Sequence, residues 1–295
     1  GIKDANKNMA VAIKHFPGDG VEELDQHLAM GVNNLSVNEW EESFGYVYRS
    51  LINDGVEAIM VGHIALPNMT RKLIKGIEDK DIKPATLSQE LLEGILRKEM
   101  GFNGVIITDA SHMIGLAATE KRCNYVPGVI KAGCDMFLFT NDNKEDISYV
   151  KKALEDGRLS IERLNDAVYR VLALKAHLHL YKEEIRIPSE EGLSIIGSEE
   201  FKKYSEQAAE ECITLVKDTR HYLPLDIKKK RRCYLVYVGS LPNSRAYKGD
   251  ETKDILIEEL QKKGFEVDVC PSFHDLEVKN GPSFMNMLTM MNKGE

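Results

Sequence analysis

The sequence predicts an α/β fold in which parallel strands alternate with helices, and three observations predict it. Short apolar runs recur along the first half of the chain, and they are apolar throughout, as in parallel strands that are buried on both faces. Stretches with apolar residues at helical spacing separate these runs. A polar residue follows each run, at the position where an α/β barrel carries its functional side chains. About four such βα units can be recognised, whereas a closed barrel contains eight, so the pattern fits part of a barrel.

The first expected strand covers residues 9–13 and ends at Lys14 and His15. The loop that follows is rich in glycine and aspartate and extends to about Gly31. Within it lies the triplet Asp25-Gln26-His27. A carboxylate and an imidazole at this spacing can supply a proton donor and the group that tunes it.

Three further strands are expected, and each has polar residues directly after it. Residues 56–61 precede His63, residues 105–108 precede Asp109, and residues 134–140 precede a cluster of Asn and Asp. In a parallel sheet these carboxyl ends lie at one edge, so we expect the polar residues to approach one another.

Helices are expected between the strands. Ser36 and Glu39 form the Ser-x-x-Glu pattern of a capping box, which predicts a helix from Ser36 to about residue 54. Trp40 lies on the apolar face of this helix, so we expect it in the core. Further helices are expected over residues 88–100, 125–132 and 159–181.

The last third of the chain predicts a second α/β unit. Residues 185–197 contain Pro188 and Gly192, and we interpret them as a linker. It separates a domain over residues 1–184 from another over residues 198–295. In the second domain we expect helices over residues 198–211 and 250–263, and strands over residues 213–217, 221–225, 234–238 and 265–269.

The composition argues against some partners. The formal net charge is −8, which disfavours a nucleic-acid surface, and the basic run at residues 228–232 is interpreted as a solvated strand entrance. No apolar run of about 18 residues is present, so no membrane span is expected. The 5 cysteines are scattered without a CxxC pair, which disfavours a disulfide framework and a zinc site. Reduced thiols fit a cytoplasmic location, although the chain starts at Gly1 and a secreted parent stays open.

Several motifs occur in a specific order along the chain. The segment Lys14–Gly20 (KHFPGDG) is followed by Asp25-x-His27, and later come Gly62-His63, Gly104–Ala110, Ala132–Met136, Glu211–Asp218 and Leu223-Pro224-Leu225. This ordered set resembles glycoside hydrolase family 3, and within it the branch that contains the β-N-acetylhexosaminidases.

The resemblance implies a fold and its extent. Residues 1–184 correspond to the C-terminal part of a (β/α)8 TIM-type catalytic barrel, and residues 198–295 to the start of an α/β sandwich domain. Family members carry barrel strands before the position of Gly1 and a longer sandwich domain. We therefore expect a fragment that is truncated at both ends and lacks a sugar-binding Asp and Arg, and its activity in isolation is left open.

The resemblance also implies a retaining glycosidase that acts on terminal β-linked sugars, in the first place β-N-acetylglucosaminides, without a metal or other cofactor. Asp109 matches the nucleophile, since a carboxylate can form and later lose a glycosyl ester. His27 matches the acid/base, with Asp25 as the dyad partner that orients its ring. Lys14 and His15 match substrate-binding positions.

Two more histidines are candidates for the same site. His63 ends its strand and either lines the pocket or is a satisfied core residue. His112 follows Asp109 by three positions and either faces the pocket mouth or has no role. Asp135 is expected to be structural.

Alternatives remain open. A β-glycoside phosphorylase or a β-glucosidase of the same family is one, because an imidazole repels anionic phosphate less than a carboxylate acid/base would. A non-catalytic sugar-binding fragment is another. A metal hydrolase could use the histidines and aspartates of the first half, but their spacing fits no compact metal motif. The oligomeric state, the sugar and the aglycone are left open.

Overall fold

A computed structural model of the chain describes residues 1–182, 190–238 and 251–270. The chain forms two compact units, Gly1–Ser194 and Ile195–Glu295, which are treated separately below. The expected linker over residues 185–197 falls partly on residues that lie outside the described ones.

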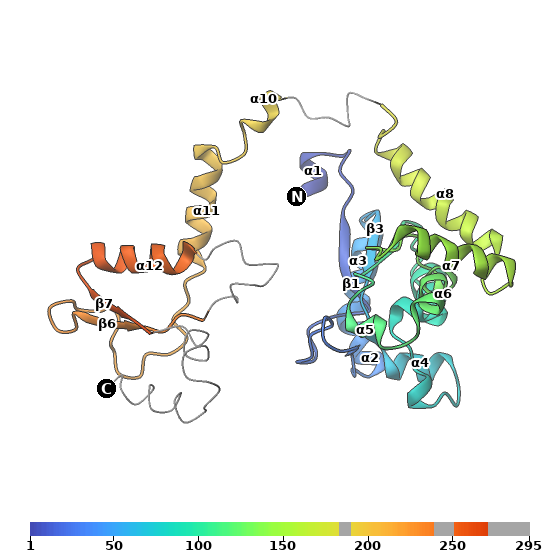
Figure 1. The fold of residues 1–295 in the computed structure, drawn as a ribbon, viewed down its shortest axis with the longest axis horizontal. Coiled ribbons are helices and arrows are strands. Elements are labelled where there is room, and N and C mark those ends of the chain that lie inside the picture. The colour runs from blue at the N-terminus through green and yellow to red at the C-terminus, as the bar shows by residue number, and fades with distance from the viewer. Residues whose placement is uncertain (183–189, 239–250, 271–295) are drawn as a thin grey trace. The chain divides into compact units, whose positions relative to one another are not determined.

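The first unit is built on three parallel strands: β1 (Ala12–Phe16), β3 (Ala58–Val61) and β5 (Val105–Thr108), in the order β1-β3-β5. Figure 1 shows β1 and β3 side by side. Between β3 and β5 the pairing is regular, from Ala58 opposite Val105 to Val61 opposite Thr108. This confirms the parallel α/β character of the first half. Among the described residues the sheet does not close into a barrel.

Two of the expected strands differ from the observed ones. β1 begins later than predicted, because its ladder with β3 extends from Ala12 to Phe16, so Lys14 and His15 lie within the strand. The expected strand over residues 134–140 is reduced to one parallel bridge between Ile107 and Met136.

A short parallel pair extends the sheet's carboxyl edge. β2 (Gly31–Val32) follows the loop that contains Asp25 and His27, and β4 (Ile64–Ala65) follows His63. The backbone N–H of Gly31 donates to the carbonyl of His63 at 3.1 Å. This pairing ties the end of the loop to the residues that follow β3.

Helical segments fill the intervals between the strands. The expected helix from Ser36 is confirmed with its capping box: Glu39 N donates to Ser36 Oγ at 3.3 Å, and Ser36 N donates to Glu39 Oε2 at 2.8 Å. The helices and helical turns of this unit are α1 (Ile2–Ala5), α2 (Val37–Trp40), η1 (Glu41–Gly45), α3 (Tyr46–Asn53), α4 (Pro67–Leu73), η2 (Asp79–Asp81), η3 (Ala85–Leu87), η4 (Glu90–Glu99), α5 (Ile114–Ala117), α6 (Arg122–Ala132), α7 (Asn143–Glu155), α8 (Ile161–His177) and α10 (Glu190–Leu193).

The core around β1 contains Trp40, as expected. Its ring is fully buried and lies edge-on to Phe16 with ring centroids 6.2 Å apart, and Phe16 in turn packs against Tyr48 at 5.2 Å. Trp40 Nε1 donates to the carbonyl of Pro17 at 2.6 Å. A buried indole N–H needs such a partner, and this one holds the segment after β1 against the helix.

Asp135 joins the segment after α6 to the rest of the unit. Its buried carboxylate pairs with Arg97 at 2.6 Å and with Arg163 at 2.7 Å, and it accepts the backbone N–H of Ile106 at 2.9 Å. A buried carboxylate needs this number of partners to offset its lost hydration. The structural role expected of Asp135 is confirmed.

The second unit contains a parallel pair of strands, β6 (Arg232–Leu235) and β7 (Glu266–Val269), together with helices α11 (Glu199–Glu211) and α12 (Glu251–Lys262). No strand forms over residues 213–217 or 221–225, so these two expectations are wrong for the described structure. Ile213 and Val216 are largely exposed, and in the described structure neither segment pairs with β6 or β7.

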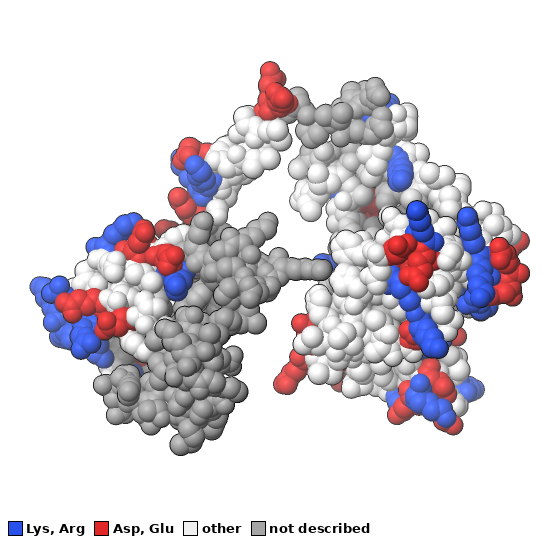
Figure 2. All heavy atoms as spheres, viewed as in Figure 1, with Lys and Arg blue, Asp and Glu red and all other residues white. Residues whose placement is uncertain are grey.

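Charges of both signs lie next to each other on the molecule. Arg231 pairs with Glu266 at 3.1 Å and Arg232 with Asp268 at 3.1 Å, which agrees with a solvated strand entrance. On the face that Figure 2 shows, basic and acidic side chains are interspersed over both units. In the described parts of the chain, no helix is both long and apolar enough to cross a membrane.

Candidate active site

Asp109 lies directly after β5, at the carboxyl edge of the sheet. Its backbone N–H donates to the carbonyl of Val61 at 2.8 Å, so the ladder with β3 holds its main chain. One carboxylate oxygen accepts the N–H of Ala110 at 2.7 Å. The side chain keeps 14% of its surface exposed, which leaves a partly desolvated carboxylate that a ligand can still reach.

His15, near the end of β1, lies between two carboxylates. Its Nε2 is 3.4 Å from Asp109 Oδ2, and its Nδ1 is 3.2 Å from Asp19 Oδ2. Because β1 and β5 flank β3, the contact with Asp109 crosses the width of the three-stranded sheet, whereas the contact with Asp19 is local. The imidazole thus connects the loop after β1 to the carboxylate after β5.

Asp25 and His27 form a pair within their loop. His27 Nδ1 lies 2.7 Å from Asp25 Oδ1, and the backbone N–H of His27 donates to the same oxygen at 2.9 Å. The backbone bond, and then the ring contact, hold the pKa of Asp25 below its ordinary value. Both side chains are open to solvent, 61% exposed for Asp25 and 71% for His27. A carboxylate that stays ionised can orient an imidazole for proton transfer.

The loop that carries this pair is joined to the segment after Asp109. Ile114 N donates to the carbonyl of His27 at 3.3 Å, and Gly115 N donates to the carbonyl of Gln26 at 3.2 Å. Main-chain hydrogen bonds therefore tie the loop of the pair to the start of α5, a few residues after Asp109.

Gln26 is a residue of this site that the sequence did not indicate. It is buried, with Nε2 donating to Asp19 Oδ2 at 2.8 Å and Oε1 accepting the backbone N–H of His63 at 2.9 Å. No spacing or composition signal marks a glutamine whose partners are distant in sequence. In the motif it is only the variable position between Asp25 and His27.

His63 does not contact the open site, which corrects its expected role in substrate binding. It has no exposed surface, and its two ring nitrogens are satisfied by Thr86 Oγ1 at 3.1 Å and the carbonyl of Ala110 at 3.0 Å. Burial lowers its pKa, which favours the neutral ring, with Nε2–H donating to the carbonyl. The core alternative is the one that the structure favours.

The other two candidates lie nearer to solvent. Lys14 is exposed and, with His15, lines a cavity of about 390 Å³ whose other walls include Phe44 and Tyr48. His112 is exposed, and its ring centroid lies 5.8 Å from that of Phe139. Lys14 therefore shares a cavity with His15, whereas nothing in the described structure links His112 to that cavity.

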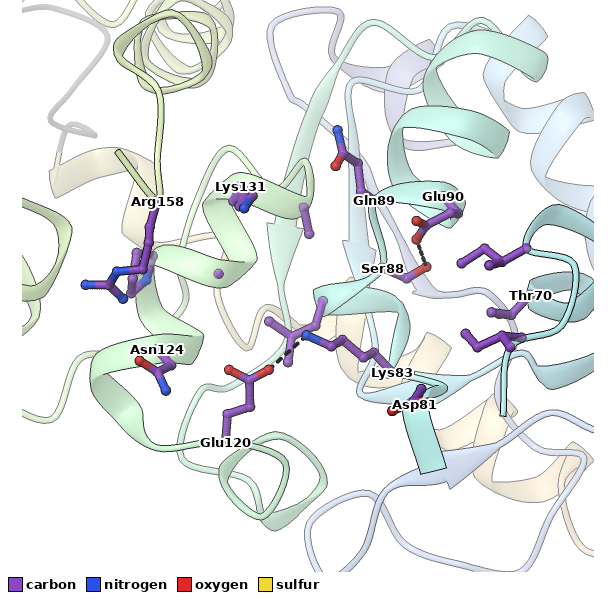
Figure 3. Close-up of a pocket in the computed structure, with 16 residues that line it drawn as sticks. Thr70, Asp81, Lys83, Ser88, Gln89, Glu90, Glu120, Asn124, Lys131 and Arg158 are labelled. Carbon is purple, nitrogen blue, oxygen red and sulfur yellow. Dashed lines mark hydrogen bonds and ion pairs between the residues drawn. The ribbon is translucent and has the colours of Figure 1, made fainter. Parts of the chain in front are cut away.

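A larger cavity of about 570 Å³ lies elsewhere in the first unit, between α4, η4 and α6 (Figure 3). Its lining includes Lys83, which pairs with Glu120 at 2.9 Å, and Ser88, which donates to Glu90 at 3.3 Å. None of the expected site residues lines it. Size alone therefore does not identify the functional site here.

No group of three or more metal-ligating side chains converges among the described residues. The aspartates and histidines of the site instead pair with one another, as in the contacts of His15 with Asp19 and Asp109.

Comparison with known proteins identifies relatives along most of the chain. A beta-N-acetylglucosaminidase/beta-glucosidase of Cellulomonas fimi is 42% identical over 257 residues, which is 85% of this chain and 45% of that protein. A beta-hexosaminidase of Methylobacillus flagellatus is 35% identical over 133 residues, 45% of this chain and 35% of that protein. The chain thus spans less than half the length of these relatives.

Solved structures show the same relationship. A beta-glucoside phosphorylase, BglX, is 40% identical with a TM-score of 0.79, over 90% of this chain and 48% of that one. A glycoside hydrolase family 3 beta-N-acetylglucosaminidase from Paenibacillus sp. is 25% identical with a TM-score of 0.69, over 97% of this chain and 52% of that one. The model of the glycosyl hydrolase family 3 N terminal domain matches residues 1–174. The chain therefore belongs to glycosyl hydrolase family 3.

Proposed function

We propose that the protein containing this chain is a retaining glycosidase that cleaves terminal β-linked sugars through a glycosyl ester on Asp109. The observation that carries the proposal is the half-buried Asp109 carboxylate, directly after β5, with the His15 ring 3.4 Å away. The names of the relatives, beta-N-acetylglucosaminidase/beta-glucosidase and beta-hexosaminidase, support a β-linked sugar, with N-acetylglucosaminides as the first choice.

The first step forms the glycosyl ester. An oxygen of Asp109 attacks the anomeric carbon, and the bond from that carbon to the glycosidic oxygen breaks. The bonding electrons go to the departing oxygen, which takes a proton from the protonated ring of His27. Asp25 keeps that ring oriented and stabilises its positive charge.

The second step releases the sugar. The neutral ring of His27 accepts a proton from an incoming water molecule, whose oxygen attacks the anomeric carbon. The ester bond breaks, and its electrons return to the Asp109 carboxylate. Two inversions give net retention of the β configuration. Lys14 and His15 contact hydroxyl groups of the reacting ring.

This chemistry needs a scaffold larger than the sheet described above. The order β1-β3-β5, with helices between the strands, supports assignment of residues 1–184 to part of a (β/α)8 barrel. The parallel pair β6–β7 with α12 supports the start of an α/β sandwich in residues 198–295.

A phosphorylase is the second candidate. The 40% identity with a beta-glucoside phosphorylase supports it, as does the acid/base pair itself. A carboxylate acid/base is anionic in the second step and repels phosphate, whereas a neutral imidazole does not. In this version a phosphate oxygen replaces water in the second step, and the product is a glycosyl phosphate.

The test uses the full-length protein with chromogenic β-N-acetylglucosaminide and β-glucoside, each with and without phosphate. Turnover that is independent of phosphate and yields free sugar supports the hydrolase, and phosphate-dependent glycosyl phosphate supports the phosphorylase. Asp109→Asn is expected to abolish turnover on both substrates. Wild-type rates in that variant would end the assignment of Asp109, and sugar binding without turnover in the wild type would favour a non-catalytic protein.

A further inference from the structure

Gln26 is buried between two neighbours that are both open to solvent. It keeps 6% of its surface exposed, whereas Asp25 and His27 are more than half exposed. A primary amide in such a position is tolerated only when its polar ends are hydrogen-bonded. Both ends of Gln26 are bonded, to partners that come from two different elements.

The chemistry of the two partners sets the orientation of the amide. The backbone N–H of His63 can only donate and lies 2.9 Å from Oε1, and the carboxylate of Asp19 accepts from Nε2 at 2.8 Å. Rotating the amide by half a turn would place its NH2 group against the N–H of His63, two donors, and its oxygen against the carboxylate of Asp19, two acceptors. The side chain therefore has one satisfied arrangement.

Two glycines allow the backbone to come this close. A Cβ on Gly62 would lie 2.8 Å from Gln26 Oε1, and a Cβ on Gly115 would lie 3.0 Å from the Gln26 carbonyl oxygen. Gly115 N also donates to that carbonyl. The side chain of Gln26 is thus held by the residues that follow β3, and its main chain by the segment after Asp109.

The partner of Gln26 continues toward the proposed nucleophile. The oxygen of Asp19 that accepts from Gln26 also lies 3.2 Å from His15 Nδ1, and His15 Nε2 lies 3.4 Å from Asp109. A continuous series of polar contacts therefore runs from the loop of His27 to the carboxylate after β5.

We propose that Gln26 is a positioning residue that holds the His27 loop at a defined place relative to Asp109. The inference rests on the proposed function, because the position of His27 matters only if it transfers the proton. Displacing a catalytic group by about 1 Å can lower a rate by about 100-fold. The rate should fall most for substrates with a poor leaving group, whose glycosidic oxygen must be protonated as the bond breaks.

Gln26→Glu tests this in the full-length protein. The variant keeps the shape and the acceptor for His63 N–H, but it places a second carboxylate against Asp19, and two such groups repel unless they share a proton. The substrates are phenyl and 3,4-dinitrophenyl glycosides of the sugar that the wild type prefers. At pH 7.5 we expect kcat/KM to fall about 10- to 100-fold on the phenyl glycoside and less than about 3-fold on the dinitrophenyl one.

Two features separate positioning from a general loss of structure. At pH 5 the two carboxyl groups can share a proton, so the deficit on the phenyl glycoside is expected to shrink. Adding Asp19→Asn exchanges donor and acceptor in the pair, and this double variant is expected to regain the wild-type ratio of the two rates. Gln89→Glu, the same change at an exposed position, is the matched control and should behave as wild type.

The result that overturns the proposal is a wild-type ratio of phenyl to dinitrophenyl rates in Gln26→Glu at pH 7.5, or an equal loss on both substrates that Asp19→Asn does not restore. If Gln26→Glu does not fold, Gln26→Met takes its place, since it keeps the length of the side chain without its polar ends: a lowered ratio of phenyl to dinitrophenyl rates at pH 7.5 supports the proposal, and a wild-type ratio overturns it. The proposed function fails separately, when Asp109→Asn keeps its turnover. If Asp109→Asn loses turnover while Gln26→Glu keeps the wild-type ratio of rates, the proposed function stands and only the positioning role of Gln26 is rejected.

Discussion

His15 and Asp109 lie 94 positions apart along the chain but only 3.4 Å apart in space, from His15 Nε2 to Asp109 Oδ2. The contact exists because β1 and β5 are both parallel neighbours of β3, so that their carboxyl ends reach the same edge. It brings a substrate-binding candidate to the proposed nucleophile.

His15→Ala is expected to lower kcat/KM by about 10- to 100-fold, because the carboxylate of Asp109 loses a polar neighbour that limits its orientation. Steady-state assays on a chromogenic β-glycoside measure the effect. His177→Ala, which removes an exposed imidazole near the end of α8, serves as control and should change little. Equal rates in His15→Ala and wild type would show that the contact has no catalytic consequence.

His27→Ala is expected to affect substrates according to their leaving groups. With phenyl glycosides, kcat/KM should fall about 100- to 1,000-fold, and with 3,4-dinitrophenyl glycosides less than about 10-fold, since an activated leaving group needs little proton donation. The ratio of the two losses is the measured quantity. A uniform loss on both substrates would count against His27 as the acid.

His63 is expected to make the stability of the first unit depend on pH. Burial lowers its pKa below the ordinary 6.5, so the unfolded chain binds a proton more readily than the folded one. The free energy of unfolding should therefore decrease as the pH falls below about 6.5, toward the lowered folded value. Urea unfolding at pH 7.5 and pH 5.5 measures the decrease.

In His63→Gln this decrease should be smaller, because the amide can bond to Thr86 and Ala110 without titrating. His177→Gln is the matched control, since that ring is exposed. The interpretation is wrong if His63→Gln loses as much stability between the two pH values as the wild type does.

Asp135→Asn is expected to destabilise the first unit by about 3–5 kcal/mol, because Arg97 and Arg163 would lose the charge that compensates their burial. Denaturant unfolding measures the change. Asp156→Asn is the control, since Asp156 pairs with Arg158 at an exposed position and should change stability little. Similar effects of the two substitutions would mean that the Asp135 cluster contributes no more than a surface pair.

Much of the fold could be predicted from local patterns. The strand at residues 105–108 and the capped helix from Ser36 agree with the structure because apolar runs and capping residues act over a few positions. The strands expected at residues 213–217 and 221–225 were wrong: an apolar run becomes a strand only when it pairs with a neighbouring strand, and in the described structure these runs do not pair with β6 or β7. Helix α7 (Asn143–Glu155) was not predicted, although Tyr149, Val150 and Ala153 face the core at helical spacing and Asp142 caps its start.

The sequence by itself determined the residue types of the candidate site and their order: a carboxylate after a buried strand, an Asp-x-His triplet in a loop, and a Lys-His pair at the first strand. Only the tertiary structure decided that His63 is buried among protein partners and that Gln26, not marked by any motif, links the loop to Asp19. The physical reason is that burial and hydrogen-bond satisfaction depend on groups distant in sequence, which meet only when the strands pair.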